Sequence, residues 1–532
     1  MNDGPHTDDA LVETSISTAA PGPSEDHPSH KEILLIFVGL MVAMLLAALD
    51  QTIVSTALPT IVGDLHGLTR LSWVVTAYLL TSTASAPLYG KIADLYGRKR
   101  IFLVAIVIFL IGSALSGVAN SMNQLIAFRA LQGLGAGGLI VLATTIIGDV
   151  VPPRERGKYQ GYFGAVFGLA SVAGPLVGGW LVQGPGWRWV FYVNVPIGIV
   201  ALVLITVTLH TPRMRVSTPI DYLGSLLVVG GISALLLVTV WGGQTYAWSS
   251  PQVLLTAAGG IVLLIAFGVR ERVAADPILP LRLFRIRVFS VANLAGFLVG
   301  ASLFGAVVYL PTYLQAARGV SASTSGMLLL PLMAGVLVAS IGSGQIISKI
   351  GRYKVFPVVG SAVMTVGMYL LSLLTAASSY LETSLAMVVV GVGVGMVMQV
   401  LVLAVQNGVD QRDLGVATSS STFFRSMGSA FGTAALGSVL SSRLTSNLAK
   451  ILPHGANVTS FKAALTGSPE SLARLSPELH HSAIVAYASA LHSVFLTAVP
   501  VAALAFVLAI ILPEIRLRSR HDGIKIAEGI AE

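Results

Sequence analysis

Two ionisable residues stand inside otherwise apolar stretches of this chain of 532 residues. Of the 24 acidic residues, Asp50 is the one that lies well inside such a stretch, roughly 26 Å of helical rise after Ile33. Arg129 lies a few residues into another apolar stretch. Burial favours the neutral form of a carboxylic acid, so a carboxyl group in this setting can take up and release a proton. The carboxyl group of Asp50 indicates proton-handling chemistry. The alternatives are a hydrated aspartate near a helix end and an arginine that reaches the lipid headgroups.

The stretches that hold these residues indicate the fold class. Hydrophobic residues make up 54% of the chain and charged residues 11%, whereas an average soluble domain carries about 25% charged residues. Apolar runs of about 20 residues, each able to cross a ~30 Å hydrocarbon layer, recur from Ile33 to Leu512. The composition predicts an all-α integral membrane protein. It excludes a soluble enzyme, a nucleic-acid-binding protein and a disulfide-stapled secreted scaffold.

We expect fourteen membrane spans and a fixed orientation. The spans are predicted at 33–58, 72–90, 101–119, 124–147, 159–183, 189–209, 220–241, 252–269, 288–316, 324–347, 355–376, 382–406, 416–439 and 491–513. With a cytosolic N-terminus, 23 of the 32 Lys and Arg fall in cytosolic loops, 7 fall outside, and Arg129 and Arg425 remain inside spans. This bias predicts that both termini are cytosolic in a multi-pass protein of the cell membrane. The net charge of +8 then reflects topology and not a surface for nucleic acid.

Internal repetition predicts the architecture. The basic loop that starts at Gly90 matches a second loop that starts at Gly344, at an offset of 344 − 90 = 254. The same offset aligns Gly174 and Gly178 with Gly428 and Gly432, and an offset of 258 aligns the ladder Gly133, Gly135, Gly137 with Gly391, Gly393, Gly395. Such matches in order indicate a duplicated bundle whose repeats are eight spans apart.

Two spans are therefore inserted between two six-helix bundles. We predict a disordered cytosolic tail over 1–32, an N-terminal six-helix bundle over 33–209, two linker transmembrane helices within 210–287, a C-terminal six-helix bundle over 288–513 with a long external loop at 440–490, and a cytosolic tail over 514–532. In the external loop, Ser476-Pro477-Glu478 is one of two helix-start signals.

Four motifs carry a resemblance to a known family. They are Gly90-Lys-Ile-Ala-Asp94-Leu-Tyr-Gly97-Arg98-Lys-Arg100, Leu49-Asp50-Gln51-Thr52-Ile53-Val54 with Ala57-Leu58-Pro59, Arg129-Ala-Leu-Gln132-Gly133-Leu-Gly135, and Gly174-Pro175-Leu-Val-Gly178-Gly179. They resemble motifs of the major facilitator superfamily and, with fourteen spans, those of the EmrB/QacA-type drug:proton antiporters. Leu95 and Ala170 depart from the family pattern without removing a charge or the Gly-Pro pair.

The resemblance implies a proton-coupled multidrug exporter that works by alternating access, is not an enzyme and needs no cofactor. We expect a monomer whose partners are protons, an amphipathic small molecule and the bilayer. The resemblance also gives Arg129 a proton-coupling role, because a fixed positive charge beside Asp50 favours the ionised carboxylate. The second half has Met387 at the position of Arg129.

Two groups of residues are assigned to the conformational change. Gly90, Asp94, Gly97 and Arg98 are predicted to form a lock, in which Asp94 pairs with Arg98 or lies at the N-terminus of a facing helix. A generic positive-inside loop is the alternative. Gly174, Pro175, Gly178 and Gly179 are predicted to form a tightly packed hinge.

Soft and polar residues inside spans are candidates for a substrate cavity. They are Tyr78, Gln132, Asn293, Tyr309, Gln315, Met398, Gln399 and Arg425. Arg425 could equally hold substrate, close an inner gate or extend toward the cytosol. No cysteine is present, which excludes disulfides and Cys-based metal sites, and we expect no metal.

Three functions compete. Export of an amphipathic compound in exchange for protons is favoured. A transporter of the same fold that moves a lipid or a native metabolite is the first alternative, and a membrane sensor without transport is the second. Duplicated halves and a single buried aspartate argue against the sensor. With one buried acid near a fixed cation, dications are expected to be poor substrates.

Overall fold

A computed structural model describes residues 30–65, 70–209, 221–243, 245–274, 276–318, 322–375, 377–451 and 477–517. Almost all of these residues are helical, as the apolar runs predict, and the all-α membrane fold is confirmed. The predicted disorder of residues 1–29 and most of the predicted tail over 514–532 lie outside the described residues.

The helices follow the predicted spans closely. They are α1 (His30–Asp64), α2 (Leu71–Tyr96), α3 (Arg98–Gly117), α4 (Met122–Val150), α5 (Pro153–Gln183), α6 (Trp189–Tyr192), α7 (Asn194–Thr208), α8 (Tyr222–Trp241), α9 (Pro251–Val273), α10 (Arg287–Arg318), α11 (Ala322–Met327), α12 (Leu330–Ile350), α13 (Val355–Ser372), α14 (Tyr380–Gly408), α15 (Leu414–Ile451) and α18 (Pro477–Ile511).

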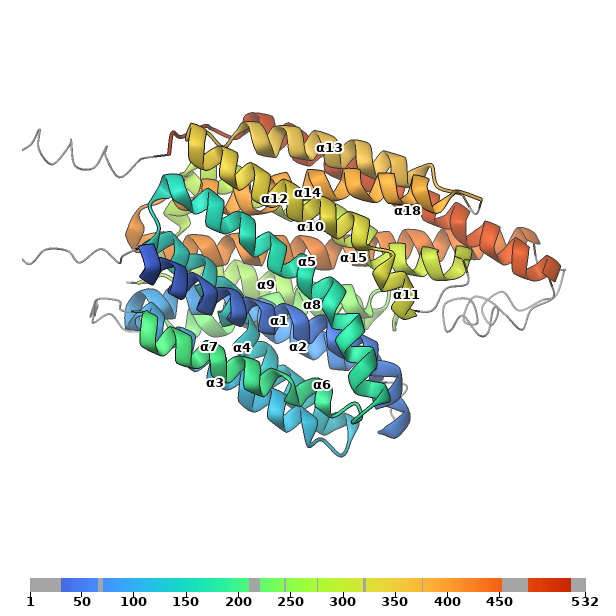
Figure 1. Cartoon of the computed structure of the whole chain (residues 1–532), viewed down its shortest axis with the longest axis horizontal. Helices are drawn as coiled ribbons and strands as arrows, with labels where there is room; N and C mark the ends of the chain where they lie inside the picture. The colour runs from blue at the N-terminus through green and yellow to red at the C-terminus, as the bar shows by residue number, and fades with distance from the viewer. Residues whose placement is uncertain are drawn as a thin grey trace, which may run out of the picture.

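Two sets of helices repeat one packing pattern. In the first half, α1–α7, α4 packs against α2 and α3 while α1 packs against α5; in the second half, α10–α18, α14 packs against α12 and α13 while α10 packs against α15. Figure 1 shows the two halves one above the other, with α8 and α9 in the middle of the view. α8 contacts α2 and α15, so the inserted hairpin bridges the halves.

Glycines set the spacing inside each half. A Cβ atom built on Gly133 of α4 would lie 2.4 Å from the Tyr78 carbonyl oxygen of α2. The equivalent atom on Gly391 of α14 would lie 2.1 Å from the Leu332 carbonyl oxygen of α12. A side chain of any size at either position would push the helices apart, so the glycine ladder lets their backbones touch.

Eleven segments are long and apolar enough to cross a membrane, by length and composition. α2, α10 and α15 complete the predicted set of fourteen by position and length. α2 and α15 fall short in apolarity because they carry polar side chains such as Thr81 and Ser85 of α2 and Thr418 and Ser421 of α15, whereas the apolar part of α10 among the described residues, Arg287–Leu303, is too short to be counted. α2 and α15 contact each other across the halves and both contact α8, so their polar groups can be satisfied away from lipid. The count of fourteen stays a prediction.

The segment 440–490, predicted as a long external loop, is helical at both ends. α15 continues to Ile451 and α18 begins at Pro477, so helix replaces both ends of the predicted loop 440–490. Leu444 and Leu448 are fully buried, and Asn447 donates a hydrogen bond to the Ala486 carbonyl oxygen of α18. The two helices therefore pack on each other beyond the predicted spans, and Pro477 is the residue that the second helix-start signal indicates.

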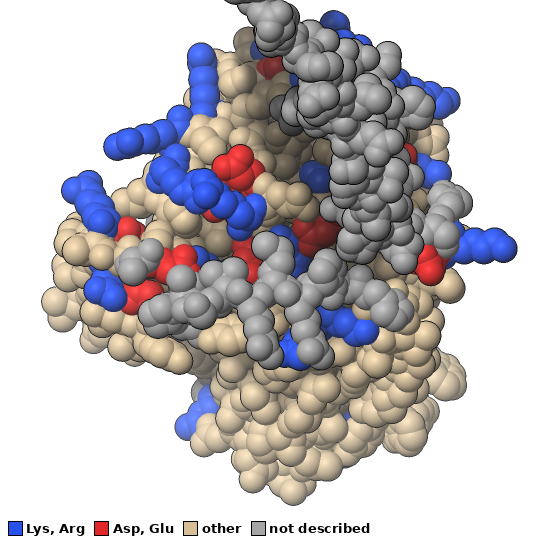
Figure 2. Space-filling model, turned by 90° about the vertical axis from the view of Figure 1, so that its left-hand side faces the viewer, with Lys and Arg blue, Asp and Glu red and all other residues tan. Residues whose placement is uncertain are grey.

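Basic side chains gather at one end of the bundle. The first turn of α1 and the last turn of α18 both lie at this end, on the left of Figure 1. Figure 2 views this end directly and shows many Lys and Arg with acidic residues between them. We call it the basic end and the other the far end.

Candidate functional site

Asp50 and Arg129 form a buried ion pair in the far half of the first bundle. An Arg129 guanidinium nitrogen lies 2.6 Å from Asp50 Oδ2, and the side chains are 1% and 0% exposed. Gln132 stands one turn after Arg129 on α4, so both face α1. Gln132 Nε2 donates to Asp50 Oδ1 over 2.8 Å, and its Oε1 accepts from Arg129 over 2.7 Å. The carboxylate is thus paired with a charge and hydrogen-bonded, as a buried ion requires.

A third helix completes this network. The chain breaks between the short α6 and α7, which places Asn194 at the first turn of α7. Asn194 Nδ2 donates to Asp50 Oδ1 over 2.9 Å and to Ser113 Oγ of α3 over 3.0 Å. Tyr78 supports Arg129 from the other side, because the guanidinium carbon lies 4.1 Å from the centre of its ring. Tyr78 and Gln132, which are also predicted in the substrate cavity, contact this ion pair.

The predicted hinge contacts α1 next to Asp50. A Cβ atom on Gly174 would lie 2.0 Å from Thr52 Oγ1, and one on Gly178 would lie 3.1 Å from the Ile53 carbonyl oxygen. Thr52 Oγ1 also donates to the Ala170 carbonyl oxygen of α5 over 2.9 Å. The two glycines therefore hold α5 against α1. A Cβ atom on Gly179 would meet nothing within 4 Å, so close packing does not extend to this residue.

Pro175 faces the other half. A Cβ atom on Gly326 of α11 would lie 3.4 Å from Pro175 Cγ. The proline is inside α5, where it removes one helical hydrogen bond. It therefore stands at a weakened point of α5 where the two halves meet.

The predicted lock lies between the halves at the basic end. Asp94 Oδ1 accepts from Arg98 over 3.0 Å, and Arg98 also pairs with Asp149 of α4. A Cβ atom on Gly415 would lie 2.4 Å from Asp94 Oδ1, so the carboxylate rests on the first turn of α15, where a negative charge is favoured. Gly90 brings α2 onto the same turn, and Gly97 turns the chain with a φ of 93°.

A second contact joins the halves at the same end. Arg154 of α5 donates to the Ser348 carbonyl oxygen over 3.1 Å and to that of Lys349 over 2.7 Å, at the last turn of α12. A Cβ atom on Gly344 would lie 2.1 Å from the Gly157 carbonyl oxygen. A cation at a helix C-terminus is favoured. The second interface therefore uses an arginine where the first uses an aspartate.

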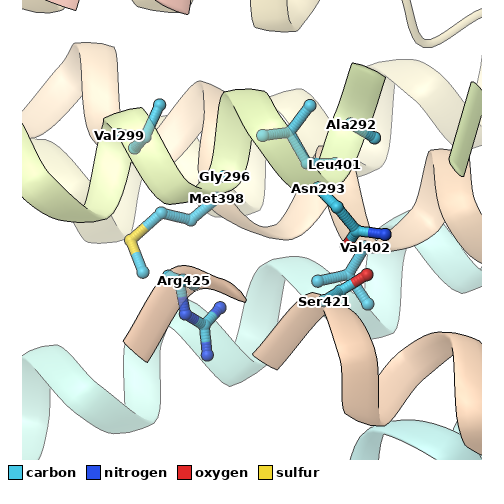
Figure 3. Close-up of a pocket in the computed structure, with 9 residues that line it drawn as sticks. All are labelled: Ala292, Asn293, Gly296, Val299, Met398, Leu401, Val402, Ser421 and Arg425. Atoms are coloured by element: carbon cyan, nitrogen blue, oxygen red, sulfur yellow. The ribbon is translucent and has the colours of Figure 1, made fainter. Parts of the chain in front are cut away.

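A small pocket lies in the second half between α10, α14 and α15. Its polar lining consists of Asn293, Ser421 and Arg425, and Met398 is among its apolar residues. In Figure 3, Asn293 and Ser421 lie at one end of the pocket and Met398 and Arg425 at the other. Three of the predicted cavity residues (Asn293, Met398 and Arg425) therefore line one pocket.

The remaining candidates lie elsewhere. Tyr309 donates to the Thr433 carbonyl oxygen over 2.9 Å and fastens α10 to α15. Gln399 is 7% exposed and lies on α14 close to Gly164 of α5, outside the pocket lining. The side chain of Gln315 lies outside the described residues. No group of three or more His, Asp or Glu in the described part of the chain could hold a metal ion.

Comparison with known families decides the identity. The model of the Major Facilitator Superfamily matches residues 40–433. The chain belongs to the major facilitator superfamily. This transporter thus shares its family with carriers of small molecules and not with enzymes.

Its relatives are transporters over most of their length. It is 40% identical over 520 residues to the multidrug transporter protein MdtP of Bacillus subtilis, covering 93% of this chain and 96% of the relative. Multidrug resistance protein 3 of the same organism is 38% identical and is matched over 78% of this chain and 80% of its own length. An MFS-type transporter of Mycobacterium tuberculosis is 43% identical over 92% of this chain and 70% of the relative.

Solved structures show the same fold at low identity. The human organic anion transporter MFSD10 superposes with a TM-score of 0.62 at 15% identity, over 90% of this chain and 99% of that one. The proton:xylose symporter XylE gives 0.61 at 13% identity, over 92% and 98%. These likenesses support the fold alone.

Three residues of these sites are not predicted from the sequence. Asn194 looks like an interfacial residue at the start of an apolar span, and Arg154 looks like one more positive-inside charge. Asp149 stands at the end of an apolar span, where an acid is ordinarily hydrated. Each gains its role from a helix that is distant in sequence, and no local pattern in this transporter signals that contact.

Proposed function

We propose that this transporter exports amphipathic small molecules in exchange for protons, with Asp50 as the proton-carrying residue. It is proposed to lie in the cell membrane as a monomer, with the basic end and both termini in the cytosol. The observation that carries this proposal is the fully buried Asp50–Arg129 pair. The names of the bacterial relatives support multidrug export.

Protonation of Asp50 would break the ion pair, but both side chains would keep other favourable contacts. Arg129 keeps the ring of Tyr78 and the Gln132 amide oxygen. Asn194 Oδ1 is a buried acceptor without a partner among the described residues. Because an amide can turn over, Asn194 can accept from a protonated Asp50 as readily as it donates to the ionised form. The network therefore accommodates both states of the carboxyl group.

A path of contacts leads from Asp50 to the interface between the halves. Thr52 follows Asp50 on α1 and hydrogen-bonds to α5, which carries the glycines and proline of the hinge. Further along, α5 contacts α12 at the basic end through Gly157. A shift of α1 on protonation would thus move α5 against the second half. We propose that the lock residues Gly90, Asp94, Gly97 and Arg98 hold the basic end closed until this shift occurs.

The test uses everted membrane vesicles with an acidified interior and rhodamine 6G, a monocationic amphipathic dye. The wild type should accumulate the dye, and an uncoupler should abolish the accumulation. Asp50→Asn keeps the size of the side chain but cannot titrate, so accumulation should fall to the level of vesicles without the transporter. Dye counterflow, which requires no net proton movement, should persist.

Asp410→Asn is the matched control, because Asp410 is an exposed carboxylate paired with an exposed arginine. This variant should accumulate the dye as the wild type does. Undiminished uphill accumulation by Asp50→Asn would overturn the assignment of Asp50. Strong accumulation of a dication in the same vesicles would contradict the expected charge preference.

A further inference from the structure

The carboxylate of Asp50 stands at one end of a chain of three hydrogen bonds. Asn194 Nδ2 donates to Asp50 Oδ1 over 2.9 Å and to Ser113 Oγ over 3.0 Å. Ser113 Oγ in turn donates to the Phe191 carbonyl oxygen over 2.8 Å. All four residues are fully buried, so solvent water does not compete for these bonds.

The break between α6 and α7 provides the last acceptor of this chain. Pro196 lies in the first turn of α7 and has no N–H to donate to the Tyr192 carbonyl oxygen four residues before it. The helix therefore ends at Tyr192 and restarts at Asn194. Carbonyl groups at a helix end commonly accept from side chains, and Phe191 accepts from Ser113 in this way.

This carbonyl group fixes the direction of every bond in the chain. A carbonyl oxygen can only accept, so the single hydroxyl proton of Ser113 is committed to Phe191. Ser113 Oγ can then only accept from Asn194, which places the amide nitrogen and not the amide oxygen beside Asp50. A hydrogen bond donated to a carboxylate stabilises its charged form. The chain therefore favours the ionised form of Asp50.

Asn194 Oδ1 is the atom that this arrangement leaves without a hydrogen bond. It is buried and has no partner in the described structure, although buried amide oxygens are ordinarily satisfied. Turning the amide over would place Oδ1 between Asp50 and Ser113, where it can accept from a protonated carboxyl group and from the hydroxyl. The amide alone suits both states of Asp50, so its neighbours decide which state is favoured.

We propose that Ser113 is a positioning residue for the proton site, because it holds Asn194 as a hydrogen-bond donor and so favours release of the proton from Asp50. This inference deepens the proposed export function and rests on it. Ser113 forms two hydrogen bonds while Asp50 is ionised, one with Asn194 and one with Phe191. With Asp50 protonated and the amide turned over, its one hydroxyl proton goes to Asn194, and the bond to Phe191 is lost. Protonation thus costs one hydrogen bond and frees the carbonyl group at the break between α6 and α7.

The titratable side chains that face Asp50 in the described structure are Arg129 of α4 and Tyr78 of α2. Arg129 pairs with Asp50, and Tyr78 interacts with it electrostatically. The other helices that pack against α1 present neutral groups at this level, namely Ala170 and Gly174 of α5, Phe191 of α6 and Asn194 of α7. A titration that depends on Asp50 is therefore not that of a neighbouring acid or histidine.

The experiment follows the protonated carboxyl group of Asp50 directly. The full-length transporter is reconstituted in phosphatidylcholine, and the C=O stretch of protonated carboxyl groups is recorded by infrared difference spectroscopy over a series of pH values. The part of the signal that Asp50→Asn lacks belongs to Asp50. In Ser113→Ala, the proton concentration at the midpoint of this signal should be about fivefold lower than in the wild type, the change expected for one hydrogen bond. An unchanged midpoint, or a shift to a higher proton concentration, would overturn the proposal.

Ser116→Ala is the matched control. Ser116 is a second fully buried serine of α3, and its hydroxyl donates to the Gly112 carbonyl oxygen of its own helix over 2.8 Å. This variant should keep the midpoint of the wild type. A shift equal to that of Ser113→Ala would mean that any hydroxyl lost from the buried face of α3 moves the midpoint, and the proposal would be wrong.

A double substitution tests whether Ser113 acts through Asn194. Asn194→Leu and the smaller Asn194→Ala both remove the amide, so a residue that acts through this amide loses its effect in either background. Adding Ser113→Ala to either variant should move the midpoint by less than about twofold, which is within the usual additivity error. A fivefold shift in both backgrounds would show that Ser113 acts by another route and would overturn the proposal.

Failure of this proposal is distinguishable from failure of the export function. In everted vesicles the medium receives the protons that Asp50 releases. Ser113→Ala should still accumulate rhodamine 6G, with half-maximal accumulation at a proton concentration in the medium about fivefold lower than for the wild type. A midpoint that moves in Ser113→Ala, with no accumulation by the wild type, would contradict proton-coupled export alone. Accumulation that requires Asp50, with a midpoint that Ser113→Ala does not move, would contradict the role of Ser113 alone.

Discussion

The two halves share a backbone plan and differ in the chemistry placed upon it. Gly133 of the first half and Gly391 of the second both touch the neighbouring helix, at Tyr78 and at Leu332. Around these equivalent contacts, Arg129, Tyr78 and Gln132 of the first half correspond to Met387, Leu332 and Val390 of the second, all of them fully or nearly fully buried. One half therefore contains an ionic network where the other contains an apolar layer.

Arg425 is the opposite case, a charge that the second half has and the first half lacks. At the offset of 258 that aligns the glycine ladders, 425 − 258 = 167, and Phe167 of the first half packs in an apolar cluster. Duplication thus supplied two copies of one scaffold, and each copy carries a charge that the other lacks.

The largest expected effect comes from making the first half resemble the second. Arg129→Met leaves Asp50 buried without its counter-ion, which should lower the free energy of unfolding by about 3–5 kcal/mol. The triple variant Asp50→Leu, Arg129→Met, Gln132→Val should recover most of that loss, because it replaces the ion pair and Gln132 with apolar groups while Asn194 keeps its hydrogen bond to Ser113. Thermal unfolding of the detergent-purified proteins measures both changes. A triple variant that is less stable than Arg129→Met would refute the equivalence of the two layers.

Glycine substitutions should rank the helix contacts of the halves. A Cβ atom on Gly428 would lie 1.9 Å from the Phe297 carbonyl oxygen, a backbone atom, whereas the nearest atoms to one on Gly174 belong to the Thr52 side chain, with Oγ1 at 2.0 Å and Cβ at 2.5 Å. Gly428→Ala should therefore destabilise more than Gly174→Ala, within a range of about 1–3 kcal/mol. Gly179→Ala should have no measurable effect on thermal unfolding. The reverse order of the first two would show that backbone contact does not decide the cost.

The interfaces at the basic end should respond more weakly. Asp94→Asn and Arg154→Ala each remove one favourable charge from a helix terminus of the opposite half, so each should shift the conformer balance by about 1 kcal/mol and slow turnover about fivefold. Substrate binding to the wild type and variants should be the same.

The chain lacks cysteine, so accessibility can be measured on a single introduced thiol. Ser421→Cys should react faster with a membrane-impermeant thiol reagent added at the basic end when either substitution is present. Unchanged turnover and labelling in Asp94→Asn would show that the predicted lock residues form only a generic positive-inside loop.

Much of this architecture can be predicted from the lengths of the apolar runs and the spacing of the glycines, because both are local features of the sequence. The pairing of Asp50 with Arg129 could also be anticipated, since two buried charges of opposite sign are costly apart. The side chains that hydrogen-bond to this pair could not be predicted from the sequence. The sequence predicts Gln132 in the cavity because a buried amide suits the lining of a cavity as well as a hydrogen-bond network. Only the position of α1 shows that Gln132 contacts Asp50.

Register between the repeats also required the structure. An offset of 254 aligns Gly174 with Gly428 in the sequence, but the interface contacts favour 258 for this pair of helices. Gly344 touches Gly157 and Gly90 touches Gly415, and 415 − 157 = 258. Gly174 then corresponds to Gly432, which contacts Ala301 of α10 as Gly174 contacts Thr52 of α1. The glycine ladder of α14 already has the offset of 258, so a short insertion precedes α14, and the interface contacts show that the same offset continues into α15.

The smallest expected effect concerns a tether that both halves have at the basic end. Lys99, at the start of α3, donates to the Thr206 carbonyl oxygen of α7 over 2.7 Å; Tyr353, just before α13, donates to the Pro513 carbonyl oxygen after α18 over 2.8 Å. The Lys99 hydrogen bond is exposed to solvent, so Lys99→Met should change stability by less than about 0.5 kcal/mol, while Tyr353→Phe should cost about 1 kcal/mol.

The tyrosine tether should depend on pH. Burial raises the pKa of the Tyr353 hydroxyl above its ordinary value, so the folded protein favours the neutral phenol. Its contribution to stability is complete below the pKa of an unfolded tyrosine, about 10, and falls as the pH rises above that value. Thermal unfolding from pH 7 to pH 11 should therefore show the difference between the wild type and Tyr353→Phe shrinking above pH 10. A difference that stays constant across this range would mean that the hydroxyl is not sheltered, and that the second half does not bind its last segment more firmly than the first.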